Sequence, residues 1–223
     1  KMMEETILFD LDGTLTDPKI GITRCVQYAL ESFGIQEKDL TKLECFIGPP
    51  LKEQFMEYAG LDEAEAGRAV EKYRERFATV GIFENSVFEG IAPMLRRLCL
   101  SGFRIGLATS KPEIYARRIL EHFQLMEYMD EVTGSELSGA RTRKAEVIAE
   151  AMRRMGAAPE RTIMVGDRRH DIEGAREEGL FSIGVLFGYG SRRELIEAGA
   201  DALCSSVEEL ETALRSRVWS QGT

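Results

Sequence analysis

The sequence contains little cysteine and histidine, the residues that build most zinc sites and disulfide frameworks. Its 223 residues include 4 cysteines and 2 histidines. No two cysteines form a C-x-x-C pair, which excludes a zinc finger of that kind and argues against a disulfide scaffold. Scattered single cysteines instead predict reduced, mostly buried thiols and a cytoplasmic location. They are Cys25, Cys45, Cys99 and Cys204.

The sequence also lacks a long apolar run and an excess of basic residues. No hydrophobic segment approaches the ~20 residues of a membrane-spanning helix, and no signal peptide is visible. Lys and Arg number 29 against 38 Asp and Glu, for a formal net charge of −9. Because nucleic-acid polymers and anionic membranes are bound by basic surfaces, we expect neither as a partner. With 43% hydrophobic residues, the composition is that of a folded globular protein.

Short apolar runs alternate with helical patterns along most of the chain. Four runs have the length and composition of buried parallel strands, and apolar residues at a 3.6-residue period separate them. The alternation predicts an α/β fold with a Rossmann-like, doubly wound parallel sheet. The strands are expected at residues 6–9, 103–108, 162–165 and 182–186, with helices over 91–98 and 147–155.

Residues 17–86 interrupt this alternation, because they contain helical patterns and no convincing strand. One apolar stripe runs from Ile22 to Phe33, and further helices are expected to begin near Leu51 and Glu63. The sequence therefore predicts an α/β core made of residues 1–16 and 87–223, with residues 17–86 inserted as a helical cap. The end of the chain, about 218–223, is expected to be a frayed tail.

Polar residues collect where the predicted strands end. Asp10 and Asp12 follow the first strand, Thr109 and Ser110 the second, and Asp167 the third. Lys144 opens the helix before that third strand, and Asp171 follows Asp167 by four residues. Ligands of doubly wound sheets bind beyond the carboxyl ends of the strands, so these groups are expected to share one rim.

The chemistry of these groups suits a phosphate ester and a magnesium ion. Asp10 and Asp12 begin on one side of an extended strand, and adding Asp167 concentrates negative charge that calls for a cation. Hard oxygen ligands favour Mg²⁺, which also accepts phosphate oxygens. Lys144 and the Thr109 hydroxyl would supply the positive charge and the donor that a phosphate requires. A carboxylate can then attack phosphorus, because the cations screen the repulsion between two anions.

Four short motifs resemble those of the haloacid dehalogenase-like hydrolases, in the same order and spacing. The first is Asp10-Leu11-Asp12-Gly13-Thr14 and the second lies at Leu107–Lys111. The third is Arg143-Lys144-Ala145-Glu146 and the fourth lies at Gly166–Asp171. The insertion after the first motif is similar to the helical C1 cap of the phosphoglycolate phosphatase-like subgroup. Residues 184–190 resemble that subgroup and its 5′-nucleotidase-like relatives.

This resemblance implies a role for each motif residue. Asp10 would be the nucleophile that forms an aspartyl-phosphate, and Asp12 the acid and base. Mg²⁺ would be held by Asp10, Asp167 and the backbone carbonyl of Asp12. The phosphoryl group would be held by Thr109, the Ser110 backbone N–H and Lys144, with Asp171 in a supporting role. Dehalogenases of the family lack the second aspartate, so Asp12 favours phosphate chemistry.

The predicted function is therefore a Mg²⁺-dependent phosphomonoesterase acting on a small phosphorylated metabolite, with phosphoglycolate as the nearest family substrate. A 5′-nucleotidase is the main alternative. A phosphomutase and a non-catalytic ligand-binding module on the same fold are further alternatives. The chain is expected to act as a monomer or a homodimer.

Several residues near the motifs keep two interpretations. His170 is expected to be a partly exposed residue at a helix start, although a proton shuttle is the alternative. Arg168 and Arg169 either lie on the surface or reach the substrate. Gly48-Pro49-Pro50 is expected to form a rigid turn, and contact with the substrate is the alternative. Gly188-Tyr189-Gly190 is expected to form a loop.

Overall fold

The computed structural model describes residues 5–216 of the chain, so the predicted frayed tail at 218–223 lies outside the described residues. The chain divides into two compact units. One is the segment Thr16–Ser86, and the other contains the residues before and after it. We call Thr16–Ser86 the inserted unit and the remainder the core unit.

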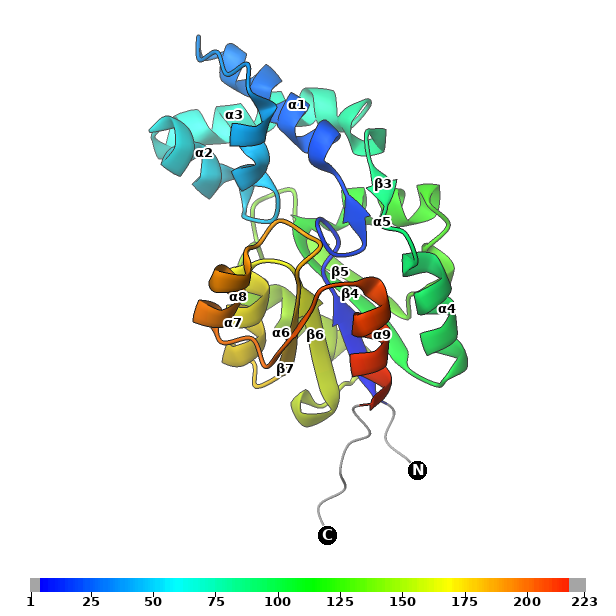
Figure 1. Cartoon of the computed structure of the whole chain (residues 1–223). Coiled ribbons are helices and arrows are strands. Elements are labelled where there is room, and N and C mark those ends of the chain that lie inside the picture. The colour runs from blue at the N-terminus through cyan, green and yellow to red at the C-terminus, as the bar shows by residue number, and fades with distance from the viewer. Residues whose placement is uncertain (1–4, 217–223) are drawn as a thin grey trace. The chain divides into compact units, whose positions relative to one another are not determined.

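The core unit is built on a six-stranded sheet in which every pair of neighbours is parallel (Figure 1). The order across the sheet is β5-β4-β1-β6-β7-β8. Four of these strands correspond to the predicted ones, while β5 and β8 were not predicted. The bounds are β1 (Thr6–Phe9), β4 (Arg104–Pro112), β5 (Glu131–Ser135), β6 (Thr162–Gly166), β7 (Phe181–Val185) and β8 (Ala202–Cys204).

Helices cover both faces of this sheet (Figure 1). Val147, Ile148 and Met152 of α6 pack with Leu8 of β1 and Met164 of β6 in one buried cluster. Burial of such side chains is the main favourable contribution to folding. The helices are α4 (Ile91–Leu100), α5 (Glu113–His122), α6 (Lys144–Met155), α7 (Arg169–Glu177), α8 (Arg192–Ala198) and α9 (Val207–Ser216), with short 3-10 turns η3 (Met126–Tyr128) and η4 (Pro159–Arg161).

The strand order places the predicted site at a topological switch point. From β1 the chain adds β4 and β5 on one side, then returns to the other side of β1 for β6. The carboxyl ends of β4, β1 and β6 are therefore neighbours, and this is where ligands bind in doubly wound sheets. Phe9 of β1 pairs with Leu107 of β4 and Val165 of β6, so the residues after these positions meet at one edge.

The inserted unit is helical, as the sequence predicts for these residues. A capping box begins α3, where the Asp62 side chain accepts the N–H of Glu65 at 2.8 Å. Phe46 and Phe55 pack with ring centroids 4.9 Å apart in its core. Two-residue strands, β2 (Thr16–Asp17) and β3 (Ser86–Val87), pair where the unit begins and ends, and the sequence shows no signal for them. The helices are α1 (Lys19–Glu31), η1 (Leu40–Phe46), α2 (Leu51–Ala59), α3 (Glu63–Phe77) and η2 (Gly81–Phe83).

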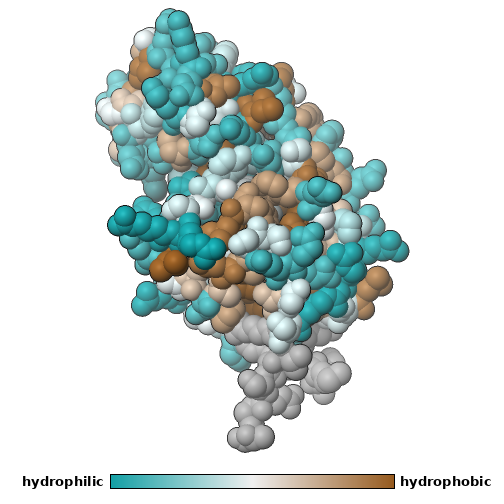
Figure 2. Space-filling model, in the orientation of Figure 1, coloured by the Kyte–Doolittle hydropathy of each residue, from teal (hydrophilic) through white to brown (hydrophobic). Residues whose placement is uncertain are grey.

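The structure meets some of the expectations drawn from the composition. The face drawn in Figure 2 carries many hydrophilic residues, which surround an area of more hydrophobic ones near its middle. None of the helices within residues 5–216 is long and apolar enough to cross a membrane. None of the four cysteines, all within residues 5–216, forms a disulfide, but only Cys25 and Cys204 are buried. The expectation that the thiols are mostly buried therefore holds for half of them, because Cys45 and Cys99 are partly exposed.

Candidate active site

The loop after β1 carries the two aspartates of the first motif. The backbone N–H of Asp10 donates to the carbonyl oxygen of Val165 at 2.9 Å, which fixes Asp10 beside the end of β6. Gly13 has φ +85°, a left-handed conformation that favours glycine. A Cβ atom at Gly13 would overlap with the carboxylate of Asp167. The glycine therefore lets the loop close tightly against the other acidic residue of the site.

A buried lysine bridges two of the predicted carboxylates. Lys144 is the first residue of α6, and its Nζ lies 2.8 Å from Asp10 Oδ1 and 2.8 Å from Asp171 Oδ1. It also donates to the carbonyl oxygen of Ala108 at 3.0 Å. Burial disfavours the ammonium, but Asp10 and Asp171 outweigh it and raise the pKa of Lys144 above its ordinary value. Lys144 is thus a permanent cation between the strand ends.

Asp167 follows β6 and is completely buried. Its Oδ1 accepts the hydroxyl of Thr14 at 3.3 Å, and its Oδ2 accepts the backbone N–H of Tyr189 at 2.8 Å. Cβ atoms at Gly188 and Gly190 would overlap with Asp167 itself. The loop predicted at 188–190 is therefore also a contact of the site, and the contact of the Tyr189 N–H was not predicted.

Asp171 combines two functions at the start of α7. Its Oδ2 accepts the backbone N–H groups of Asp167 at 3.1 Å and Arg168 at 3.0 Å, and its Oδ1 faces Lys144. An acidic side chain in the first turn is stabilised by the unpaired N–H groups of a helix. Asp171 is therefore both an acceptor for the start of α7 and a partner of Lys144.

Three carboxylates form a group that fits a divalent cation. Asp10, Asp167 and Asp171 are buried, and each offers an oxygen within 4.8 Å of the others. Burial, and then Asp171, raise the pKa of Asp10 from 3.8 to about 7 against the opposing effect of Lys144. Burial, Asp171 and Asp10 also raise the pKa of Asp167 well above its ordinary value. This buried negative charge and its oxygen-only donors suit Mg²⁺, which would neutralise it.

The Asp12 side chain points to a different partner. Its Oδ2 lies 3.0 Å from Nζ of Lys111, and both side chains are buried. Its Oδ1 is buried and meets no hydrogen-bond partner within residues 5–216. An unpaired buried acceptor carries a free-energy cost, and such groups are typical of functional sites. Lys111 is the last residue of the second motif, and its pairing with Asp12 was not predicted.

Thr109 and Ser110 lie where β4 becomes irregular. The pairing of β4 with β5 shifts register between Ala108 and Pro112. Within this segment the Thr109 hydroxyl accepts the Lys111 N–H at 3.2 Å, and the Ser110 carbonyl accepts the Ser135 hydroxyl at 2.7 Å. Thr109 is buried and directly follows Ala108, whose carbonyl binds Lys144.

Three residues of the fourth motif with open interpretations, Arg168, Arg169 and His170, lie between Asp167 and Asp171 in the sequence. Arg168 pairs with Glu194 at 2.9 Å, and the backbone N–H of exposed Arg169 donates to the same carboxylate at 2.9 Å. His170 is partly exposed in the first turn of α7, as the sequence predicts, and its buried Nε2 has no hydrogen-bond partner in the described part of the chain. Burial lowers the pKa of His170 from 6.5 to about 4, so the ring is neutral near pH 7.

Comparison with known proteins agrees with this architecture. The chain is 48% identical over 210 residues to a 5′-nucleotidase from Pseudomonas aeruginosa, covering 94% of this chain and 95% of the relative. It is 38% identical over 215 residues to the tyrosine-protein kinase PtkA from Mycobacterium tuberculosis, covering 94% and 72%. It is 26% identical over 211 residues to phosphoglycolate phosphatase 1 from Pseudomonas aeruginosa, covering 92% and 77%.

Solved structures give the same result. The crystal structure of a predicted phosphatase from Clostridium acetobutylicum superposes with a TM-score of 0.94 at 45% identity, covering 96% of this chain and 99% of that one. The family model of the haloacid dehalogenase-like hydrolases matches residues 7–185, which contain all four motifs. This chain belongs to the haloacid dehalogenase-like hydrolases and is a phosphatase of that family.

Proposed function

We propose that Asp10 is the nucleophile of a phosphomonoesterase with an aspartyl-phosphate intermediate. The observation that carries this proposal is the buried group of Asp10, Lys144 and Asp171, with Asp167 beside it. A carboxylate oxygen of Asp10 forms a bond to phosphorus while the ester P–O bond breaks. Lys144, 2.8 Å from Asp10, lowers the repulsion between the attacking carboxylate and the anionic phosphate.

Asp12 is proposed to move the protons of both half-reactions. It donates a proton to the leaving alcohol, then accepts one from the water that attacks the aspartyl-phosphate. The second attack breaks the bond to Asp10, releases inorganic phosphate and restores both carboxyl groups. The buried Oδ1 of Asp12, with no partner in the described residues, supports this role because it is an acceptor that a substrate or water would satisfy.

Asp10, Asp167 and the backbone carbonyl of Asp12 are proposed to hold the metal. When bound, Mg²⁺ would screen charge on the phosphate and the carboxylates and help to orient them. Asp171 supports the set through its bonds to Lys144 and to the Asp167 N–H. The phosphoryl group is proposed to be held by Thr109, the Ser110 N–H and Lys144.

The substrate is proposed to be a small phosphorylated metabolite of the cytoplasm. Two substrate classes have support among the relatives. A nucleoside 5′-monophosphate is favoured by the 48% identity to a 5′-nucleotidase, and phosphoglycolate by the 26% identity to a phosphoglycolate phosphatase. The larger identity makes nucleotides the first class to test. We propose residues 17–86 as a cap whose side chains select the organic part of the substrate.

The decisive experiment is a Mg²⁺-dependent screen ranked by kcat/KM. It includes phosphoglycolate, the nucleoside 5′-monophosphates and p-nitrophenyl phosphate, each with wild type and Asp10→Asn. Glu173→Gln is the matched control, because it converts an exposed carboxylate of α7 to an amide. We expect hydrolysis by wild type and the control but not by Asp10→Asn. Full turnover by Asp10→Asn would refute the assignment of Asp10 as the nucleophile. The absence of turnover of any phosphate ester by wild type would refute the proposed function.

A further inference from the structure

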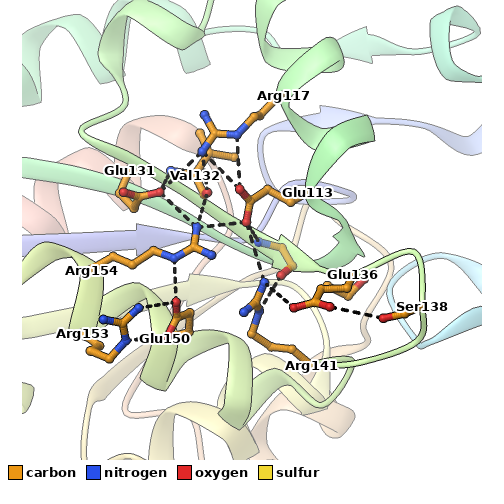
Figure 3. A network of polar contacts seen from close by, with 12 residues as sticks. Glu113, Arg117, Glu131, Val132, Glu136, Ser138, Arg141, Glu150, Arg153 and Arg154 are labelled. Atoms are coloured by element: carbon orange, nitrogen blue, oxygen red, sulfur yellow. Dashed lines mark hydrogen bonds and ion pairs between the residues drawn. The ribbon is translucent and has the colours of Figure 1, made fainter.

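A network of arginines and glutamates lies beside β5, one of the two edge strands of the sheet (Figure 3). Arg117 and Arg154 both donate to the carbonyl oxygen of Val132, at 3.1 and 3.3 Å. Arg154 also pairs with Glu113 at 3.0 Å and Glu131 at 3.3 Å. These contacts satisfy polar groups of an edge strand, which would otherwise be open to pairing with another chain. Edge protection is the purely structural explanation of the network.

Edge protection does not account for one part of the network, in which side chains bind both backbone polar groups of Gly134. The N–H of Gly134 donates to Glu113 Oε2 at 3.3 Å, and its carbonyl accepts from Nε of Arg141 at 2.9 Å. Although burial opposes it, the Gly134 N–H and Arg154 hold the pKa of Glu113 below its usual value. Glu113 therefore stays ionised near neutral pH. We call Glu113, Gly134 and Arg141 the edge clamp.

The backbone of Arg141 has a conformation that is uncommon outside glycine. Arg141 has φ +55°, and only Gln124 shares a positive φ among the non-glycine residues that the structure describes. This conformation costs free energy in any residue with a Cβ, and it persists only where other contacts enforce it. Here the guanidinium bond to Gly134 is such a contact, and Glu136 lies 3.7 Å from the same side chain.

Both ends of the edge clamp adjoin phosphate-binding residues. Arg141 lies three residues before Lys144, in the loop that enters α6, and Glu113 lies three residues after Ser110. Ser135, next to Gly134, donates to the Ser110 carbonyl at 2.7 Å. A Cβ at Gly134 would come within 2.6 Å of the Lys111 carbonyl oxygen, so the two segments are closely packed. The clamp thus joins the second and third motifs.

We propose that Arg141 is a positioning residue for phosphate binding. By anchoring the loop before α6 to Gly134, it sets where Lys144 enters the site relative to the Thr109–Ser110 segment. This inference rests on the proposed function, because Lys144, Thr109 and Ser110 are the groups assigned to the phosphoryl oxygens. A small displacement of such groups lowers phosphate affinity and turnover while leaving the fold in place.

The test compares three substitutions of Arg141 with two matched controls in the full chain. Arg141→Met removes the anchor, Arg141→Gly removes it and also relieves the positive φ, and Arg141→Lys keeps a cation that can reach Gly134. Arg153→Met is the first control, since that exposed arginine of the same network pairs with Glu150. Gln124→Gly is the second, since it relieves the same backbone conformation at an exposed position after α5.

Calorimetric binding of inorganic phosphate with Mg²⁺, and kcat and KM for p-nitrophenyl phosphate, provide the readouts. We expect Arg141→Met and Arg141→Gly to weaken phosphate binding and lower kcat/KM by about 10–100-fold, with partial recovery in Arg141→Lys. Both controls should stay within about twofold of wild type, because surface changes of this kind have small effects. Circular dichroism and thermal unfolding verify that each variant is folded.

Two results would overturn the inference. Wild-type phosphate binding in Arg141→Gly would show that the side-chain anchor is unnecessary. An equal loss in Arg153→Met would show that the network only supports the fold. If wild type itself neither binds phosphate nor hydrolyses p-nitrophenyl phosphate, the proposed function fails and this inference fails with it.

Discussion

The substitution Asp10→Asn is expected to stabilise the metal-free protein while it removes activity. The Asp10 carboxylate is buried beside Asp171, and its pKa is raised from 3.8 to about 7. Between these two pH values the folded protein binds the proton more tightly than the unfolded chain does. Stability is therefore lost as pH rises from about 4 to about 7, and this cost is absent at low pH.

The size of this effect follows from the two pKa values. The shift from 3.8 to about 7 corresponds to about 4 kcal/mol, at 1.36 kcal/mol per pKa unit, as an upper limit. Asparagine has the shape of the protonated carboxyl group and does not ionise. We therefore expect the free energy of unfolding of Asp10→Asn to exceed that of wild type by about 1–4 kcal/mol at pH 8. Near pH 4 the two values should be equal. The amide is no nucleophile, so turnover should be lost.

Urea unfolding followed by circular dichroism measures this difference. The titrations are run at pH 4 and pH 8 with EDTA, and Glu173→Gln again serves as the control. Adding Mg²⁺ at pH 8 should narrow the gap, because a cation that binds the folded wild type stabilises it by mass action. The reasoning is refuted if Asp10→Asn is less stable than wild type at pH 8, or if the gap is the same at both pH values.

Three further changes test separate parts of the proposal. Asp12→Asn should slow hydrolysis by about 10²–10⁴-fold, with a smaller loss for p-nitrophenyl phosphate because its leaving group needs no proton. Equal losses for all leaving groups would argue against Asp12 as a proton donor. Excess chelator should abolish activity and Mg²⁺ should restore it. Ca²⁺ should inhibit, because its larger and looser coordination shell would misplace the Asp10 carboxylate. Full activity in chelator would exclude the metal site. Replacement of Pro50 or Leu51, at the start of α2 in the inserted unit, should change kcat/KM unequally among phosphoglycolate, nucleotides and p-nitrophenyl phosphate. A common factor for all substrates would assign that loop a structural role.

The strands that the sequence predicted are those with runs of large apolar residues. β1 and β6 consist of buried residues throughout, so each reads as a continuous apolar run. β5 contains Glu131, Thr133, Gly134 and Ser135, and Val132 is its one large apolar residue. β8 has three residues. These strands lie at the two edges of the sheet, and neighbouring strands and helices specify them more than their own composition does.

Some residues of the candidate site belong to short sequence motifs, whereas other contacts of the site form only between segments that are far apart in the sequence. Asp10, Lys144, Asp167 and Asp171 belong to short motifs, and the strand ends bring these four together as the sequence predicts. Tyr189 contacts Asp167 through its backbone N–H, which no side-chain pattern encodes. The pairing of Lys111 with Asp12 and the left-handed backbone of Arg141 depend on where separate strands and loops meet. Only the folded chain contains that information.

Most of the site residues also hold the fold together, and this determines which substitutions are informative. Asp171 accepts two backbone N–H groups at the start of α7, so its replacement changes a helix terminus as well as the partner of Lys144. Asp167 likewise fixes Thr14 and the Tyr189 loop. Burial raises the pKa of both Asp10 and Asp167, so the ionised form of each opposes folding. At Asp167 the bonds to Thr14 and Tyr189 offset that effect, so its replacement should change stability less than replacement of Asp10. Loss of activity with a gain in stability is therefore expected at Asp10, whereas loss of both is expected at Asp171.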